Sequence, residues 1–163
     1  LPAHIEPSPE RRRKMKILVD ADACPVKEII VRAAKKYEKE VLMVCDVAHQ
    51  LFYEEPFVTV KTVDKGADSA DLVLANLAQK QDLCVTSDYG LATLFLTKGA
   101  VVLHPNGFFY GNDTIDRMLF ERHISREMRR QKKSRGGHIK KRTPEQDAAF
   151  QKSLEIFLAQ HQE

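Results

Sequence analysis

The chain lacks any long apolar segment. No apolar run in its 163 residues approaches the roughly 20 residues that span a bilayer. Its start also lacks the apolar stretch and cleavage site of a secretory signal. These absences argue against a membrane protein or a membrane partner, and they predict a cytoplasmic location.

Cysteine is scarce as well. The sequence has Cys24, Cys45 and Cys84 only, an odd number with no CxxC pair among them. A disulfide framework or a zinc site needs more cysteines at closer spacing. Because each of the three lies in or beside an apolar run, we expect buried thiols in a reducing compartment.

The composition is that of an ordinary globular protein. Hydrophobic residues make up 43% of the chain and charged residues 30%, which excludes a disordered chain. At this length one domain is the simplest expectation. We place it over residues 15–163 and expect residues 1–14, which have proline and charge but no periodicity, to be a leader or tag-like extension.

Short apolar runs alternate with helical patterns along the domain, which predicts an α/β fold with a mainly parallel sheet. Strands are expected over residues 16–20, 41–45, 57–63, 83–86 and 100–103, the third of them near a sheet edge. Helices are expected over residues 25–37, 69–79, 91–97, 112–131 and 143–160. Pro25 is expected at the first helical position, and Thr143-Pro144-Glu145-Gln146 has the pattern of a capping box. The helix over 112–131 shows a thin apolar stripe, with its other faces basic.

Aspartates follow these strands. Asp20 and Asp22 come after the first strand, Asp68 and Asp71 after the third, and Asp88 after the fourth. The carboxyl ends of parallel strands share one edge, and in the strand order 3-2-1-4-5 Asp20 and Asp88 face each other across the switch point. Crowded carboxylates repel unless a cation compensates. Oxygen ligands without histidine or cysteine favour Mg²⁺ or Mn²⁺, which can activate water for phosphodiester hydrolysis.

Positive charge gathers near the C-terminus. Residues 117–142 carry eleven arginines and lysines against two glutamates, which suits a polyanionic partner such as RNA. The expected phosphate contacts are Arg130, Lys132, Lys133, Arg135, Gly136, Gly137, His138, Lys140, Lys141 and Arg142. Self-association into a homo-oligomer stays open.

Four motifs carry a family resemblance: VDADACPVK at 19–27, DKGADSADLVLAN at 64–76, TSDYGLA at 86–92 and RGGHIKKRTPEQDAAF at 135–150. They resemble the YaiI/YqxD family of bacterial proteins, which is similar to PIN-like nucleases. The resemblance implies a three-layer PIN-like domain with a clustered acidic site. It matches Asp20, Asp71 and Asp88 to the acidic positions of PIN-like domains and Asp68 to the metal-site aspartate of NYN domains. The implied function is a metal-dependent nuclease acting on RNA.

Two alternatives stay open. Gly90 stands where many PIN domains have another acidic residue, so the chain is alternatively a non-catalytic RNA-binding or regulatory protein. Val-Asp-Ala-Asp after a strand also resembles the start of a HAD-type phosphatase. That reading lacks a paired-aspartate motif after the fourth strand and room for a cap domain.

Overall fold

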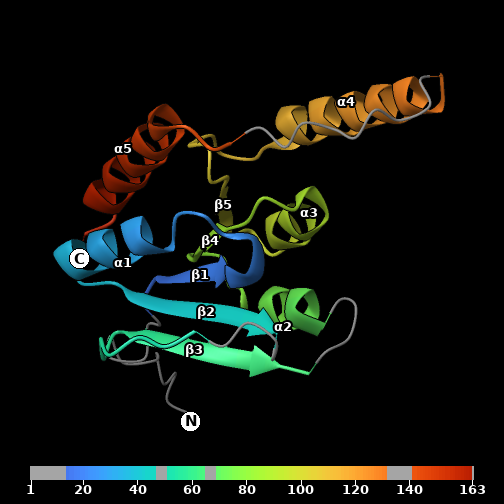
Figure 1. Ribbon diagram of the computed structural model, residues 1–163. Helices are drawn as coiled ribbons and strands as arrows, with labels where there is room; N and C mark the ends of the chain where they lie inside the picture. The colour runs from blue at the N-terminus through green and yellow to red at the C-terminus, as the bar shows by residue number, and fades with distance from the viewer. Residues whose placement is uncertain (1–13, 47–50, 65–68, 132–140, 163) are drawn as a thin grey trace, which may run out of the picture.

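A computed structural model (Figure 1) describes residues 14–46, 51–64, 69–131 and 141–162. The described residues form a five-stranded sheet with helices on both faces. The strands are β1 (Lys16–Asp20), β2 (Glu40–Asp46), β3 (Val58–Val63), β4 (Leu83–Val85) and β5 (Val101–Leu103). The helices are α1 (Lys27–Tyr37), α2 (Ser69–Leu77), α3 (Tyr89–Thr97), α4 (Asn112–Gln131) and α5 (Pro144–Gln160), with a short 3₁₀ helix, η2, over Ala21–Ala23. None of these helices is long and apolar enough to cross a membrane.

The strand order is β3-β2-β1-β4-β5, and every neighbouring pair is parallel. This confirms the predicted α/β class, the order and the edge position of β3. The central strand β1 pairs with β2 on one side and β4 on the other, so the switch point lies between β1 and β4. Ligands of open α/β folds bind outside the carboxyl ends of the strands at this point.

Two hydrophobic cores cover the two faces of the sheet. Alternate residues of one strand point to opposite faces, so Ile17 and Val19 pack with α1 and α5, whereas Leu18 packs with α2 and α3. Phe150 of α5 and Phe95 of α3 are both fully buried and anchor their helices. The result is the three-layer α/β/α architecture that the sequence predicted.

The predicted start of the first helix was wrong. Pro25 lies in a turn, and α1 begins at Lys27. The chain first forms η2, and Asp22 within it accepts hydrogen bonds from the backbone nitrogen of Asp46 at 3.0 and 3.2 Å. The extra turn therefore ties the end of β1 to the end of β2 before the helix starts.

The faces of α4 also differ from prediction. Ile115 and Met118 pack against the core, but Phe120, Ile124 and Met128, spaced four residues apart, are 65%, 41% and 53% exposed. The helix therefore has apolar side chains on two faces, and Met128 does not belong to the packed one. Figure 1 shows α4 extending well beyond α3.

None of the three cysteines forms a disulfide, and all three are buried. The capping box at the start of α5 is present. The Thr143 side chain accepts from the backbone nitrogen of Gln146, and the Gln146 side chain accepts from the backbone nitrogen of Thr143. Both observations confirm the sequence-based expectations.

Candidate carboxylate site

The ends of β1 and β4 meet through one hydroxyl group. Thr86, directly after β4 and 1% exposed, donates its hydroxyl to Oδ2 of Asp20 at 3.0 Å. The same hydroxyl oxygen accepts from the backbone nitrogen of Asp88 at 3.0 Å. Because β1 and β4 are paired up to Val19 and Val85, Asp20 and Thr86 are the next residues in register. Thr86 thus fixes both the Asp20 carboxylate and the backbone of Asp88.

Asp20 is the electrostatic centre of the site. It is 9% exposed, and burial raises the pKa of its carboxyl group from the ordinary 3.8 to about 6. The hydrogen bond from Thr86 opposes that rise in pKa, whereas the charges of Asp71, Asp22 and Asp88 add to it. These four aspartates, which we call the carboxylate site, come from β1, η2, α2 and the start of α3. The sequence-based expectation that these aspartates form one metal site stays a prediction.

Asp88 also stabilises the start of a helix. It is the N-cap of α3, and its Oδ1 accepts from the backbone nitrogens of Gly90 at 2.8 Å and Leu91 at 3.4 Å. Both bonds use the same oxygen, so Oδ2 takes no part in the cap. A helix cap and a ligand are therefore compatible roles for this side chain.

Asp22 and Asp71 sit at the exposed side of the site. Asp22 is exposed and already holds the end of β2 through Asp46. Asp71 is half-buried in the first turn of α2. Asp68, the remaining predicted ligand, lies outside the described residues.

The donor set suits a hard divalent cation, because every member is a carboxylate. The raised pKa of Asp20 shows a place where a positive charge would relieve repulsion. In the described ranges, without Asp68, no three His, Cys, Asp or Glu side chains are grouped so as to hold a metal ion. The carboxylate groups are thus of the type that binds such a cation, but the described residues bring fewer of them together than the five ligands that the sequence predicted.

A tyrosine supports the site from behind. Tyr110 is 5% exposed, and its hydroxyl donates to the backbone oxygen of Thr86 at 3.1 Å. Burial and the nearby charge of Asp88 raise the pKa of this phenol far above its usual range. Tyr110 therefore stays protonated and keeps donating. Sequence reasoning missed both Thr86 and Tyr110; the only signal for Thr86 was its place just before Ser87-Asp88.

The predicted phosphate contacts have mixed positions. Arg130 is exposed on α4 and Lys141 is exposed just before α5. Those outside the described residues are Lys132, Lys133, Arg135, Gly136, Gly137, His138 and Lys140. Arg142 is described, and its surroundings differ from those of an open phosphate ligand.

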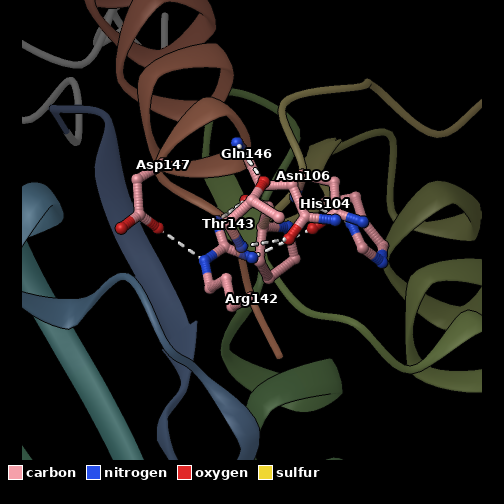
Figure 2. Close-up of polar contacts among 7 residues, drawn as sticks. His104, Asn106, Arg142, Thr143, Gln146 and Asp147 are labelled. Carbon is pink, nitrogen blue, oxygen red and sulfur yellow. Dashed lines mark hydrogen bonds and ion pairs between the residues drawn. The ribbon is translucent and has the colours of Figure 1, made fainter. Parts of the chain in front are cut away.

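Arg142 clasps two parts of the fold together (Figure 2). Its Nε donates to Oδ1 of Asp147 at 2.5 Å and its Nη1 to Oδ1 of Asn106 at 2.9 Å, while Nη2 donates to the backbone oxygen of Pro105. The side chain is 21% exposed. These bonds use three of the five N–H donors of the guanidinium group and attach the start of α5 to the turn after β5, so Arg142 acts chiefly as a positioning residue.

The turn that Arg142 holds is itself tightly built. His104 stacks on Phe108 with ring centroids 4.3 Å apart and accepts, through Nδ1, from the backbone nitrogen of Asn106 at 2.8 Å. Burial and the charge of Arg142 lower the pKa of His104 to about 4, so the imidazole is neutral at pH 7. The turn that Arg142 holds follows the carboxyl end of β5. Arg142 therefore lies at the same edge of the parallel sheet as the carboxylate site.

Comparison with known proteins identifies the family. The family model described as "Uncharacterized BCR, YaiI/YqxD family" matches residues 18–160. A UPF0178 protein of Ruminiclostridium cellulolyticum is 51% identical over 144 residues, covering 88% of this chain and 92% of its own length. UPF0178 proteins of Alkaliphilus oremlandii and Natranaerobius thermophilus are 44% and 42% identical, covering 88% and 90% of this chain and 91% and 97% of their own lengths. No solved structure matches the chain. Since the match spans nearly the whole described fold, the chain belongs to the YaiI/YqxD family.

Proposed function

We propose that the protein is a metal-dependent nuclease that hydrolyses phosphodiester bonds in RNA at the carboxylate site. The observation that carries the proposal is the junction of Asp20 and Asp88 through Thr86 at the switch point of a parallel sheet, where the charges of Asp71 and Asp22 also act on Asp20. Burial and the charges of the other three aspartates raise the pKa of Asp20. A divalent cation, and through it a phosphate, would compensate this negative charge.

In this proposal Asp20, Asp68, Asp71 and Asp88 are the ligands of Mg²⁺ or Mn²⁺, with Asp22 as a further ligand. The ion would draw the described carboxylates closer together than they lie in this structure. A bound ion of this kind lowers the pKa of a water molecule and stabilises the charge that develops on a phosphodiester. Thr86 keeps the Asp20 carboxylate oriented, and Tyr110 holds the backbone of Thr86 in place. Below pH 6 a proton occupies Asp20, and binding of the cation would release that proton.

The basic segment suits a nucleic acid as the substrate. Arg130 and Lys141 are exposed, and phosphate contacts of this kind position a strand without reading its sequence. Arg142 supports them indirectly by fixing the start of α5. We further place the protein in the cytoplasm, because none of its cysteines is paired in a disulfide.

The test is a cleavage assay with purified protein. Single-stranded RNA, structured RNA and DNA are incubated with Mg²⁺, with Mn²⁺ or with EDTA, using the wild type and the variants Asp20→Asn and Asp88→Asn. We expect cleavage of RNA that needs the metal and is lost in both variants. Asp88→Asn is informative because asparagine also caps helices well, so α3 remains intact.

Calorimetry gives a second readout. Because the cation displaces a proton from Asp20, its affinity should rise about tenfold per pH unit up to about pH 6 and then level off. Cleavage that persists in Asp20→Asn, or neither cleavage nor metal binding in the wild type, would refute the proposal. RNA binding without cleavage would favour the non-catalytic alternative, and phosphate release from a phosphomonoester would favour the HAD-type one.

A further inference from the structure

The rotation of α4 about its axis is fixed by three contacts. Ile115 and Met118 pack against the core, and the guanidinium carbon of Arg122 lies 4.6 Å from the centre of the Tyr89 ring. At about 100° per residue, these three side chains lie within about 60° of one another around the helix. They define the side of α4 that faces the body of the protein.

The arginines of α4 continue along that side. Arg126, Arg129 and Arg130 follow Arg122 at four, seven and eight residues, which is the spacing of one helix face. All four are exposed, and we call them the arginine row. The acidic residues of the helix lie on its other faces, and these are Asp113, Asp116, Glu121 and Glu127. Apart from Glu127, which pairs with Arg130 at the border of the row, charges of opposite sign are separated around the helix.

The row begins beside the carboxylate site. Tyr89, which Arg122 covers, is the residue after Asp88 and the first residue of α3. From Arg122 to Arg130 the helix advances by about 12 Å, and Figure 1 shows this part of α4 reaching beyond α3. A chain that leaves the site along α4 would therefore meet the four arginines at about 0, 6, 10.5 and 12 Å along the helix axis.

We propose that the arginine row binds the phosphate backbone of a single RNA strand as that strand extends away from the carboxylate site. The proposal rests on the proposed function, since it names the form of substrate that the same site would take. A single row of cations matches one backbone, whereas proteins that bind duplex RNA contact successive grooves. The guanidinium group of Arg122, an exposed residue, lies over the Tyr89 ring and gives a flat surface of the kind on which unpaired bases stack.

Local partners of the arginines leave them open to phosphate. The pair of Arg130 with Glu127 is 3.8 Å long, and its side chains are 77% and 47% exposed, so it contributes little and exchanges readily. Arg129 donates through Nε to the backbone oxygen of Ser125 at 3.4 Å. Stabilisation of the helix C-terminus would explain arginines in the last turn, but not Arg122 and Arg126.

The experiment measures binding separately from cleavage. A fluorescently labelled oligouridylate and an RNA hairpin duplex are titrated with Asp20→Asn protein in EDTA over a range of salt concentrations. Adding Arg126→Ala and Arg129→Ala should weaken oligouridylate binding at least tenfold and reduce the salt slope by about 1.4, because each phosphate contact on a single strand contributes about 0.7.

The matched control is Arg117→Ala in the same background. Arg117 lies on another face of the same helix, 3.9 Å from Glu121 in an exposed pair, so its loss should change binding less than twofold. With otherwise wild-type protein in metal, the double arginine variant should raise KM for RNA and leave kcat unchanged.

Three results would overturn the proposal: an equal loss in Arg117→Ala, unchanged binding in the double variant, or duplex binding as tight as that of the single strand. Equal competition by polyglutamate would also overturn it, because the row would then serve an acidic protein. If the row binds RNA as expected but no metal supports cleavage, the proposed function fails and the arginine row stands.

Discussion

Replacing Asp20 with asparagine should stabilise the protein at neutral pH. The folded state holds the pKa of Asp20 at about 6, against 3.8 in the unfolded chain. A raised carboxyl pKa means that stability is fully present below pH 3.8 and is lost as the pH rises through 6. The difference corresponds to about 3 kcal/mol, which the wild type gives up when Asp20 ionises.

The asparagine side chain keeps the useful contact and removes the charge. Its amide oxygen can accept the hydroxyl hydrogen bond of Thr86, which Oδ2 of Asp20 accepts at 3.0 Å. Repulsion from Asp71, Asp22 and Asp88 disappears with the charge. We therefore expect Asp20→Asn to exceed the wild type by up to about 3 kcal/mol at pH 8 and to match it near pH 4. The melting temperature at pH 8 should rise by roughly 6 to 10 °C.

The assay is urea unfolding followed by circular dichroism, in EDTA, at intervals from pH 4 to pH 8. The quantity of interest is the difference between variant and wild type at each pH, because titration of other groups cancels in it. Asp116→Asn, at an exposed position on α4, is the control and should differ little in stability from the wild type. Adding Mg²⁺ or Mn²⁺ should reduce the difference in unfolding free energy between Asp20→Asn and the wild type, since only the wild type binds the ion tightly.

A difference that is constant with pH would refute the reasoning, since it would mean that Asp20 does not titrate near 6. A variant less stable than the wild type at pH 8 would refute it more strongly. In that case Asp20 would have a favourable partner rather than three repulsive neighbours.

Two further predictions concern residues that hold the site and the fold. Thr86→Val removes the hydroxyl that donates to Asp20 and accepts from Asp88. Unfolding experiments should show a loss of about 1 to 3 kcal/mol in the free energy of unfolding. The midpoint of the Asp20 titration should move above pH 6, because the Thr86 hydrogen bond lowers the pKa of Asp20, and Thr86→Ser should restore both values. Gly107→Ala should cost about 2 kcal/mol or more, because Gly107 has φ +95° and a Cβ there would lie 2.7 Å from the backbone of Ala149. Gly111→Ala, where the nearest atom to a Cβ is 3.8 Å away, should change stability by less than about 0.5 kcal/mol, and equal losses in the two glycine variants would contradict this explanation.

The sequence was sufficient for the fold because its signals were local. Each buried strand is a short apolar run that ends in a polar residue, and parallel strands place those ends at one edge. Asp20 and Asp88 could therefore be brought together before any coordinates were known. Register was the missing information: only the pairing of Val19 with Val85 shows that Thr86 is the residue beside Asp20.

The helix α4 shows where periodicity fails. Its apolar residues occupy two faces, and the pattern alone does not say which face packs. The contacts of Ile115, Met118 and Arg122 decide the question, and they assign Phe120, Ile124 and Met128 to the opposite side. The sequence alone shows only that a segment of 26 residues is basic. The same contacts show that four arginines of this segment lie along one side of α4.

The role of Arg142 could not be predicted from its charge alone. In the sequence it is the last member of a basic run, equivalent to its neighbours. In the structure its guanidinium group is engaged by Asp147, Asn106 and Pro105, so three of its five N–H donors are already in use. Charge density predicts which segment meets a polyanion, but burial and hydrogen bonding decide which arginines are available.

The carboxylate site and the arginine row meet at two consecutive residues. Asp88 caps α3 with one oxygen and shares the site with Asp20, and Tyr89 beside it lies under Arg122. A phosphate bound between them would have a cation-binding edge on one side and guanidinium groups on the other. The negative charge that makes Asp20 costly in the empty protein and the positive charge along α4 are then both compensated by the same substrate and its metal. This coupling predicts that metal and RNA bind with positive cooperativity, each tightening the other by the same factor. Calorimetric titration of Mg²⁺ with and without oligouridylate would measure that factor, and independent binding would show that the two charged surfaces do not share a ligand.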